Sequence, residues 1–203
     1  MKIMITSALF LLPLLLIIFS SCRQQVPAPV ADVPPYTAAE VAQRVVLLLK
    51  AKDFAGLQPY TILDKGIRCT PYAYVDVDKD RVLSANALSG ALADLNVYLW
   101  GSYDGTGDPI TLTTADYYAK FISDKDYPTA TQQGTGKRLG VSNSKDNSAT
   151  AYPGATIYEF YYRDKDATEE MKSFTWGSLR LVLTEYKPGD WRLLGVIHDQ
   201  WTI

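Results

Sequence analysis

Apolar residues recur at helical spacing shortly after residue 40, which predicts an amphipathic helix in this part of the chain. Thr37 stands just before this run and Glu40 follows three residues later, which is the spacing of a capping box at a helix start. Such a helix needs a sheet to cover with its apolar side. The residues on that side are Val41, Val45, Leu48 and Leu49.

The end of the chain alternates in the manner of strands. We expect strands at 156–163, at about 175–186 and at 190–201, the last two joined around Lys187-Pro188-Gly189-Asp190. Pairing Lys187 with Asp190 sets the register and gives an apolar face and a mixed face. The expected apolar-face pairs are Leu179 with His198, Leu181 with Val196, Leu183 with Leu194, and Glu185 with Arg192. The expected mixed-face pairs are Trp176 with Trp201, Ser178 with Asp199, Arg180 with Ile197, and Val182 with Gly195.

Shorter elements fill the region between the first helix and these strands. We expect helices at 54–60, 85–94 and 114–122, strands at 67–70, 97–103 and 110–113, and loops around one short strand at 124–155. Helices that come early and long antiparallel strands that come late favour an α+β fold. The predicted architecture is a curved, mostly antiparallel sheet with the N-terminal helices packed on its concave face.

Composition and charge exclude two classes of protein. Of the 203 residues, 47% are hydrophobic and 21% are charged, with 20 Lys and Arg against 22 Asp and Glu. This hydrophobic content excludes a disordered polymer, and the formal net charge of −2 excludes a basic nucleic-acid binder. We therefore expect one folded domain over 37–203 and no nucleic-acid partner.

The N-terminus has the layout of an export signal. Lys2 gives a positive start, residues 8–19 are apolar apart from Pro13, and this run is shorter than the roughly 20 residues that span a bilayer. Phe19-Ser20-Ser21-Cys22 resembles the lipobox of bacterial lipoproteins. The resemblance implies a signal peptide at 1–21 and a mature Cys22 that carries diacylglyceryl and fatty-acyl chains such as palmitate. Ordinary secretion, with Cys22 incidental, is the alternative.

Residues 22–36 follow as a proline-rich tether that would lift the domain off the membrane. After the acylated Cys stands Arg23 rather than Asp, which resembles the outer-membrane sorting signal of enterobacterial lipoproteins. We therefore expect a lipid-anchored protein of the bacterial cell envelope, at the outer membrane. Acylation of Cys22 would leave Cys69 without a disulfide partner, and we expect the Cys69 thiol to be buried in a strand.

Several segments carry a resemblance to known proteins. Lys52-Asp53-Phe54-Ala55-Gly56-Leu57 and the late segments LRLVLTEY and DWRLLGVI resemble the nuclear transport factor 2-like superfamily, over about residues 37–203. This resemblance implies a cone-shaped, cystatin-like α+β fold and a homodimer formed through the outer sheet face. KGIRCTPYAYVD, YLWGSYDGTGDPITLT and GVIHDQWTI resemble a group of exported bacterial proteins of unassigned function.

Candidate chemistry centres on the single histidine. In a cone-shaped fold His198 would lie on the helix-facing side of the last strand, where superfamily enzymes such as dehydratases and isomerases keep acid and base groups. The alternative is a buried His198 bonded to a backbone carbonyl or a tyrosine. Further ligand-binding candidates, as an anion clamp or as hydrogen-bond donors in an open cavity, are Arg68, Tyr72, Tyr74 and Asp104.

Two other motifs are interpreted as structural. Asp199 should point away from His198 in a regular strand, which argues against a His-Asp dyad. Asp76-Val77-Asp78-Lys79-Asp80 has the alternating carboxylates of a calcium loop, but Arg81 stands where glycine is needed and Ala87 where a bidentate Glu is needed. We interpret this segment as a solvated turn, and we expect no metal and no cofactor.

These patterns predict a membrane-anchored envelope lipoprotein whose domain binds a small ligand or an envelope protein and is not catalytic. The anchor-and-tether layout, together with the lack of a nucleophile elbow, Walker or zinc motif in the sequence, favours this hypothesis. The alternative is an envelope enzyme that uses His198 as general acid or base in the cone cavity.

Overall fold

The computed structural model describes residues 36–202. The predicted signal peptide, Cys22 and the tether up to residue 35 lie outside the described residues. Helix α1, Ala38–Lys50, is the first element of the described part of the chain. The Thr37 hydroxyl accepts from the Glu40 amide and the Glu40 carboxylate accepts from the Thr37 amide, which confirms the predicted capping box.

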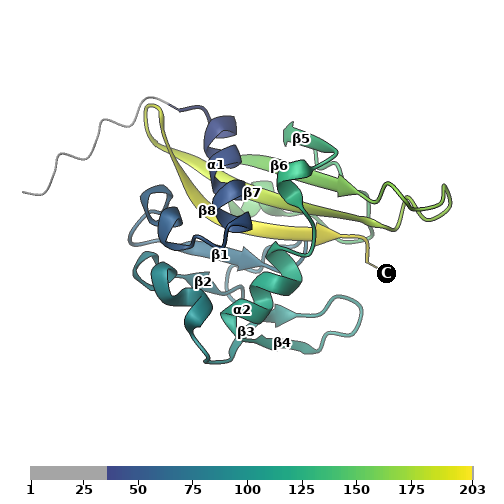
Figure 1. The fold of residues 1–203 in the computed structure, drawn as a ribbon, viewed down its shortest axis with the longest axis horizontal. Coiled ribbons are helices and arrows are strands. Elements are labelled where there is room, and N and C mark those ends of the chain that lie inside the picture. Colours follow the sequence, from purple (N-terminus) through teal and green to yellow (C-terminus); the bar gives the residue numbers. More distant parts are fainter. Residues whose placement is uncertain (1–35, 203) are drawn as a thin grey trace, which may run out of the picture. The chain divides into compact units, whose positions relative to one another are not determined.

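Six strands form a mixed sheet in the order β2–β1–β8–β7–β6–β5 (Figure 1). β1 runs parallel to β8, and the other neighbouring strands are antiparallel. This arrangement confirms an α+β fold with a mostly antiparallel sheet. The strands are β1 (Ile67–Thr70), β2 (Val82–Leu83), β5 (Gln132–Thr135), β6 (Thr156–Arg163), β7 (Trp176–Lys187) and β8 (Asp190–Gln200). β3 (Tyr98–Ser102) and β4 (Pro109–Leu112) form a separate hairpin.

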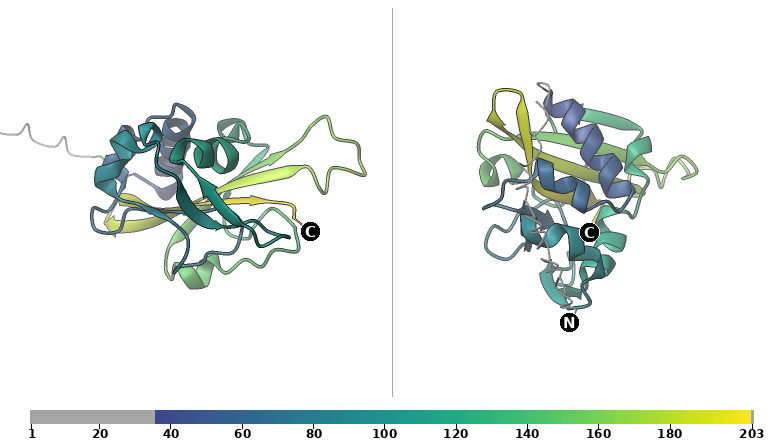
Figure 2. Two further views of the ribbon diagram at one scale, coloured as in Figure 1. Left: turned by 90° about the horizontal axis from the view of Figure 1, so that it is seen from below. Right: turned by 60° about the vertical axis from the view of Figure 1, so that its left-hand side comes forward.

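α1 lies across the face of the sheet formed by β6, β7 and β8 (Figure 2). Its buried residues and the inward-facing residues of the strands belong to one hydrophobic core, as the apolar pattern predicts. Removal of this apolar surface from water is the main favourable contribution to folding. The buried residues of α1 are Val41, Ala42, Val45, Val46 and Leu49.

The other helices are short, and most are not regular α-helices. The predicted helix at 54–60 is the 3₁₀ helix Ala55–Tyr60, in which Pro59 lacks a backbone donor. The predicted helix at 114–122 begins as α2, Thr114–Tyr117, and ends in a π turn, Tyr118–Ile122. Ala85–Ala93 and Tyr127–Thr129 are 3₁₀ helices, and α3 is Ser148–Ala151. Among residues 36–202, no helix is both long enough and apolar enough to cross a bilayer.

The closing hairpin keeps the predicted register between Ser178 and Val182 and again at its turn. The confirmed pairs are Lys187 with Asp190, Leu179 with His198, Leu181 with Val196, Ser178 with Asp199, Arg180 with Ile197, and Val182 with Gly195. After Val182 the register shifts by one residue, so Leu183 pairs with Leu193 and Glu185 with Trp191. The predicted pairs of Leu183 with Leu194 and Glu185 with Arg192 are therefore wrong. The predicted pair of Trp176 with Trp201 is also not formed, because β8 ends at Gln200.

The mixed face of this hairpin is buried beneath residues 136–155. Arg138 donates to both carboxylate oxygens of Asp199, at 2.6 and 2.7 Å. Arg180 donates to Asp146 at 2.8 Å and to the Ser148 hydroxyl at 3.0 Å. Because these charged groups are paired, a face with polar residues can be removed from solvent. We call residues 136–155 the covering segment.

Candidate functional site

His198 faces the helical side of the sheet and is sealed there. Its side chain is 2% exposed. The Nδ1 atom donates to the carbonyl oxygen of Pro71 at 2.9 Å, and the ring meets the edge of Phe121 with centroids 5.4 Å apart. This is the arrangement given above as the alternative, a buried histidine bonded to a backbone carbonyl.

Asp124 is the acidic neighbour of His198. Its Oδ2 lies 3.5 Å from Nε2 of His198, and its Oδ1 accepts from the Tyr127 hydroxyl at 2.8 Å. Burial raises the pKa of Asp124, but the adjacent His198 imidazole and the hydrogen bond from Tyr127 outweigh burial and lower this pKa overall. Asp199 points to the other face, as predicted, and binds Arg138. The imidazole is thus part of a buried polar cluster that sequence analysis did not identify.

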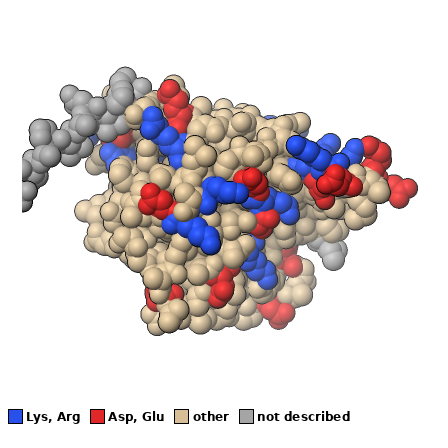
Figure 3. Space-filling model, viewed as in Figure 1, with Lys and Arg blue, Asp and Glu red and all other residues tan. Residues whose placement is uncertain are grey.

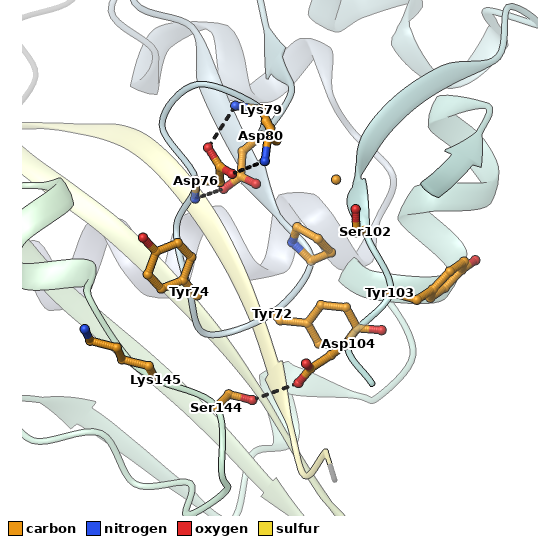
Figure 4. A pocket seen from close by; sticks show the side chains of 12 residues that line it. Tyr72, Tyr74, Asp76, Lys79, Asp80, Ser102, Tyr103, Asp104, Ser144 and Lys145 are labelled. Carbon is orange, nitrogen blue, oxygen red and sulfur yellow. Dashed lines mark hydrogen bonds and ion pairs between the residues drawn. The ribbon is translucent and has the colours of Figure 1, made fainter. Parts of the chain in front are cut away.

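A cleft of about 360 Å³ lies next to the Pro71 carbonyl that binds His198, and Figure 4 shows the side chains that line it. Pro71 and Tyr72 belong to its wall, so the bond from His198 to the Pro71 carbonyl helps to fix that wall. Three parts of the chain line the cleft: residues 71–80 between β1 and β2, residues 101–104 at the end of β3, and residues 144–145 of the covering segment. We call this space the Asp80 cleft.

Asp80 is the most buried charged group of the cleft, at 7% exposure. Its Oδ2 accepts from the Thr70 hydroxyl at 2.6 Å and from the Asp76 amide at 3.0 Å. Its Oδ1 lies toward Gly101, where a Cβ would stand 3.8 Å away. Burial raises the pKa of Asp80 to about 6, and the bonds from Thr70 and Asp76 only partly offset it. This carboxyl can therefore exchange a proton close to neutral pH.

Three of the predicted ligand-binding residues come together in this cleft: Tyr72, Tyr74 and Asp104 (Figure 4). Tyr72 is half-buried, and burial raises the pKa of its hydroxyl. Tyr74 is 51% exposed, so its ring is open to a ligand. Asp104 accepts from the Ser144 hydroxyl at 3.2 Å, which links the β3–β4 turn to the covering segment.

Arg68 and His198 do not line the Asp80 cleft. The Nη1 atom of Arg68 donates to the backbone carbonyl of Asp80 at 3.0 Å, and the Arg68 side chain lines a different pocket. The structure therefore does not form an anion clamp of Arg68 with Tyr72, Tyr74 and Asp104.

The cleft also uses residues that the sequence assigned to a solvated turn. Asp76, Lys79 and Asp80 all line it, and Lys79 forms an ion pair with Asp76 at 3.5 Å. In the sequence, the alternating carboxylates were the only sign that this turn belongs to a site. The sequence does not reveal the contact of Asp80 with Thr70 on β1, which removes Asp80 from solvent. In residues 36–202, no group of three or more His, Cys, Asp or Glu side chains is placed to hold a metal ion.

Charge on the molecular surface is mixed. On the face seen in Figure 3, Lys and Arg side chains alternate with Asp and Glu side chains and gather into no large patch of one sign. This distribution agrees with the formal net charge of −2 and offers no broad charged docking surface on that face.

No protein-family model, curated protein or solved structure gives a significant match to this chain.

Proposed function

We propose that this chain is a lipid-anchored lipoprotein of the bacterial envelope whose α+β domain binds a small ligand in the Asp80 cleft and does not catalyse a reaction. The observation that carries this proposal is the convergence of Tyr72, Tyr74 and Asp104 around the buried Asp80 carboxylate. The cleft volume of about 360 Å³ falls within the range of roughly 300 to 1,000 Å³ that is usual for ligand sites.

The groups in the cleft favour a ligand with several hydroxyl groups and one flat apolar face, as in a saccharide. Ionised Asp80 and Asp104 are acceptors only, so they call for ligand hydroxyl or amine donors. The Lys145 ammonium supplies donors from the opposite wall. The ring of Tyr74 gives an apolar surface with a polar tip. Because both signs of charge line the cleft, a ligand of large net charge is disfavoured.

The anchor and the fold family belong to the same proposal. Cys22 would hold the protein in the outer membrane through its acyl chains, and the tether would place the cleft away from the lipid surface. A long helix ahead of three long late strands supports a cone-shaped fold of the nuclear transport factor 2-like superfamily. A homodimer through the outer sheet face would have to form against the covering segment, which buries much of the β7–β8 hairpin on that side.

The geometry gives the catalytic alternative no support. A general acid or base must reach its substrate within hydrogen-bond distance. The His198 side chain is 2% exposed and its Nδ1 is engaged by the Pro71 carbonyl. His198 is therefore assigned a positioning role, in which it holds Pro71 and Tyr72 at the cleft wall.

Saturation-transfer NMR with a panel of soluble mono- and disaccharides and amino sugars tests the proposal. The protein is the chain from Gln24 to Ile203, which contains all the described residues, 36–202. At least one sugar should give a signal that is lost in Tyr74→Ala and in Asp80→Asn. The matched control is Tyr186→Ala, because Tyr186 has a similar exposure of 55% but lies at the β7–β8 turn.

Two outcomes would contradict the small-ligand proposal. One is a panel without any signal, and the other is a signal that Tyr74→Ala and Asp80→Asn leave unchanged. Cross-linking of the full chain in the envelope would then decide whether a protein partner occupies this face of the domain instead.

A further inference from the structure

A second pocket, of about 430 Å³, lies between the β1–β2 edge of the sheet and the end of the covering segment. Its polar lining comes from Lys65, Arg68, Tyr152 and Thr184. Its apolar lining includes Val82 and Leu194. We call this space the Arg68 pocket. It shares no lining residue with the Asp80 cleft.

The charge in the Arg68 pocket is of one sign. Lys65 and Arg68 both line it, and no carboxylate does. Within residues 36–202, neither of these two cations forms an ion pair. Arg68 is nevertheless held in place, because its Nη1 donates to the Asp80 carbonyl at 3.0 Å. A guanidinium has five N–H donors in a fixed plane, so most of them remain free for an anion.

Tyr152 adds a hydroxyl without a partner to the same pocket. Its phenol oxygen is buried and makes no hydrogen bond in the described part of the chain. It lies over β8 so closely that a Cβ on Gly195 would stand 2.6 Å from it. Burial raises the pKa of Tyr152 to about 12, and the closeness of the Arg68 guanidinium to this hydroxyl acts in the opposite direction. A buried polar group without a hydrogen-bond partner is rare in folded proteins, so the Tyr152 hydroxyl calls for a partner from outside the chain.

The remaining walls are apolar. Val82 is 38% exposed although it pairs with Arg68 across the β1–β2 ladder. Leu194 and Ala155 contact the small apolar cluster around Val182 and Ile197 on the outer face of the sheet. Hydrocarbon placed against these side chains would be removed from water, which is favourable.

From the pair of cations, the unpartnered hydroxyl and the apolar walls, we infer that the Arg68 pocket binds an amphipathic organic anion. The anionic head, a carboxylate or a phosphate, lies at Arg68 and Lys65, and a short hydrocarbon part lies along Val82 and Leu194. This site is separate from the proposed function of the Asp80 cleft, and either site can exist without the other.

Titration of ¹⁵N-labelled protein, Gln24 to Ile203, with octyl phosphate tests the inference. The amides of Ala151, Tyr152 and Leu194 should shift in a saturable manner. Inorganic phosphate should bind at least about tenfold more weakly, because it lacks the hydrocarbon part. The absence of saturable shifts at these amides, or equal binding of both probes, would overturn the inference.

Charge variants separate this site from general attraction between the protein and an anion. Lys65→Gln should raise the Kd for octyl phosphate about two- to fivefold, since Lys65 is an exposed cation. Arg68→Gln should raise it by about tenfold or more. Lys187→Gln is the matched control, because it removes an exposed lysine at the β7–β8 turn. An equal effect of Lys65→Gln and Lys187→Gln would overturn the site, even if Arg68→Gln fails to fold.

The same anion chemistry can come from a free amphiphile or from a lipid headgroup. Sedimentation with vesicles of phosphatidylcholine containing phosphatidylglycerol distinguishes these sources. Co-sedimentation that Lys65→Gln weakens would identify a lipid headgroup at the Arg68 pocket. Binding of octyl phosphate without co-sedimentation would identify a free amphiphile.

Discussion

Asp80 is a carboxyl group whose protonation is coupled to folding. Its pKa is about 6 in the folded protein and near its ordinary value of 3.8 when unfolded, so the folded state binds more protons between these values. The contribution of Asp80 to stability should therefore fall as pH rises from 4 to 7. Asp80→Asn has no carboxyl to titrate at this position. Between pH 4 and pH 7 its free energy of unfolding should therefore rise relative to that of wild type by about 1 to 3 kcal/mol. Urea unfolding of both proteins at pH 4, 5, 6 and 7 measures the difference.

The control for Asp80 is Asp78, an exposed carboxyl in the same turn. Asp78→Asn should leave the pH dependence of unfolding close to that of wild type. If the Asp80→Asn and wild-type curves run parallel between pH 4 and 7, burial does not disfavour the ionised Asp80 as argued.

His198 should be a stability residue. His198→Ala removes the bond to the Pro71 carbonyl and leaves a gap beside Phe121, which should cost about 1 to 3 kcal/mol. At about 2 to 4 °C per kcal/mol for a domain of this size, thermal unfolding would detect the loss. A double-mutant cycle with Asp124→Asn should show coupling, because the two side chains lie 3.5 Å apart. An unchanged melting temperature would instead favour a functional use of His198.

For single residues, the sequence predicts which face of the sheet a side chain occupies better than it predicts which other side chains it contacts. Period-2 alternation correctly separates His198 from Asp199. The predicted burial of the Cys69 thiol is also confirmed, because Cys69 is 1% exposed. It cannot identify Asp124 as the neighbour of His198, because that contact joins β8 to the loop after the π turn across 74 positions of the chain. Tyr72, Tyr74 and Asp104 were predicted as ligand residues, but their convergence with Asp80 depends on tertiary packing that no local pattern encodes.

The covering segment depends on the close approach of Gly140 to Trp176. A Cβ added at Gly140 would overlap the indole ring of Trp176. Gly140→Ala should therefore displace the segment or the ring, lower stability by about 1 to 3 kcal/mol and shift tryptophan fluorescence to longer wavelength. Urea unfolding followed by fluorescence measures both effects.

Gly90 offers the matched control for this substitution. A Cβ at Gly90 meets nothing within 4 Å, and the residue lies in a helical segment, so Gly90→Ala should leave stability unchanged or raise it by up to about 1 kcal/mol. Equal stability of Gly140→Ala and Gly90→Ala would mean that the covering segment is not packed on Trp176.

The elements themselves were predictable where local signals are strong. The capping box locates the start of α1, and the Pro-Gly turn locates the closing hairpin. The register shift after Val182 was not predictable, because a bulge changes which residues pair without changing the alternation on either side of it. The 3₁₀ character of Ala85–Ala93 was missed for a similar reason, since 3₁₀ and α-helices share residue preferences.

For the whole molecule, the order of helices and strands predicts the α+β class but not the full sheet. The parallel pairing of β1 with β8 joins strands separated by more than 100 residues, and it sets both the Asp80 cleft and the Arg68 pocket at the β1 side of the sheet. Four-residue β1 carries too little pattern to specify such a partner. Both candidate sites therefore depend on the one strand pairing that the sequence does not reveal.

The proposed anchor is also a property of the whole molecule, and the two cysteines provide its test. In a Gram-negative host given labelled palmitate, the full chain should take up label, be processed and sediment with membranes. Cys22→Ala should take up no label and should accumulate as the longer precursor, because processing of lipoproteins requires the modified cysteine. Ordinary secretion predicts instead that wild type is unlabelled and that Cys22→Ala is processed and released like wild type.

Cys69→Ala is the internal control for this labelling. Burial raises the pKa of the Cys69 thiol to about 12, and the residue is 1% exposed, so Cys69 has neither the thiolate nor the access that acylation requires. Cys69→Ala should therefore keep the label and the membrane fraction of wild type, with at most a modest loss of stability from the smaller side chain. Loss of label in Cys69→Ala together with retention in Cys22→Ala would place the lipid on the wrong cysteine for the proposed anchor. If Cys69→Ala keeps the palmitate label and is processed, while Cys22→Ala does neither, Cys22 is the residue that anchors the domain to the membrane. Both candidate sites would then act on a membrane-anchored protein.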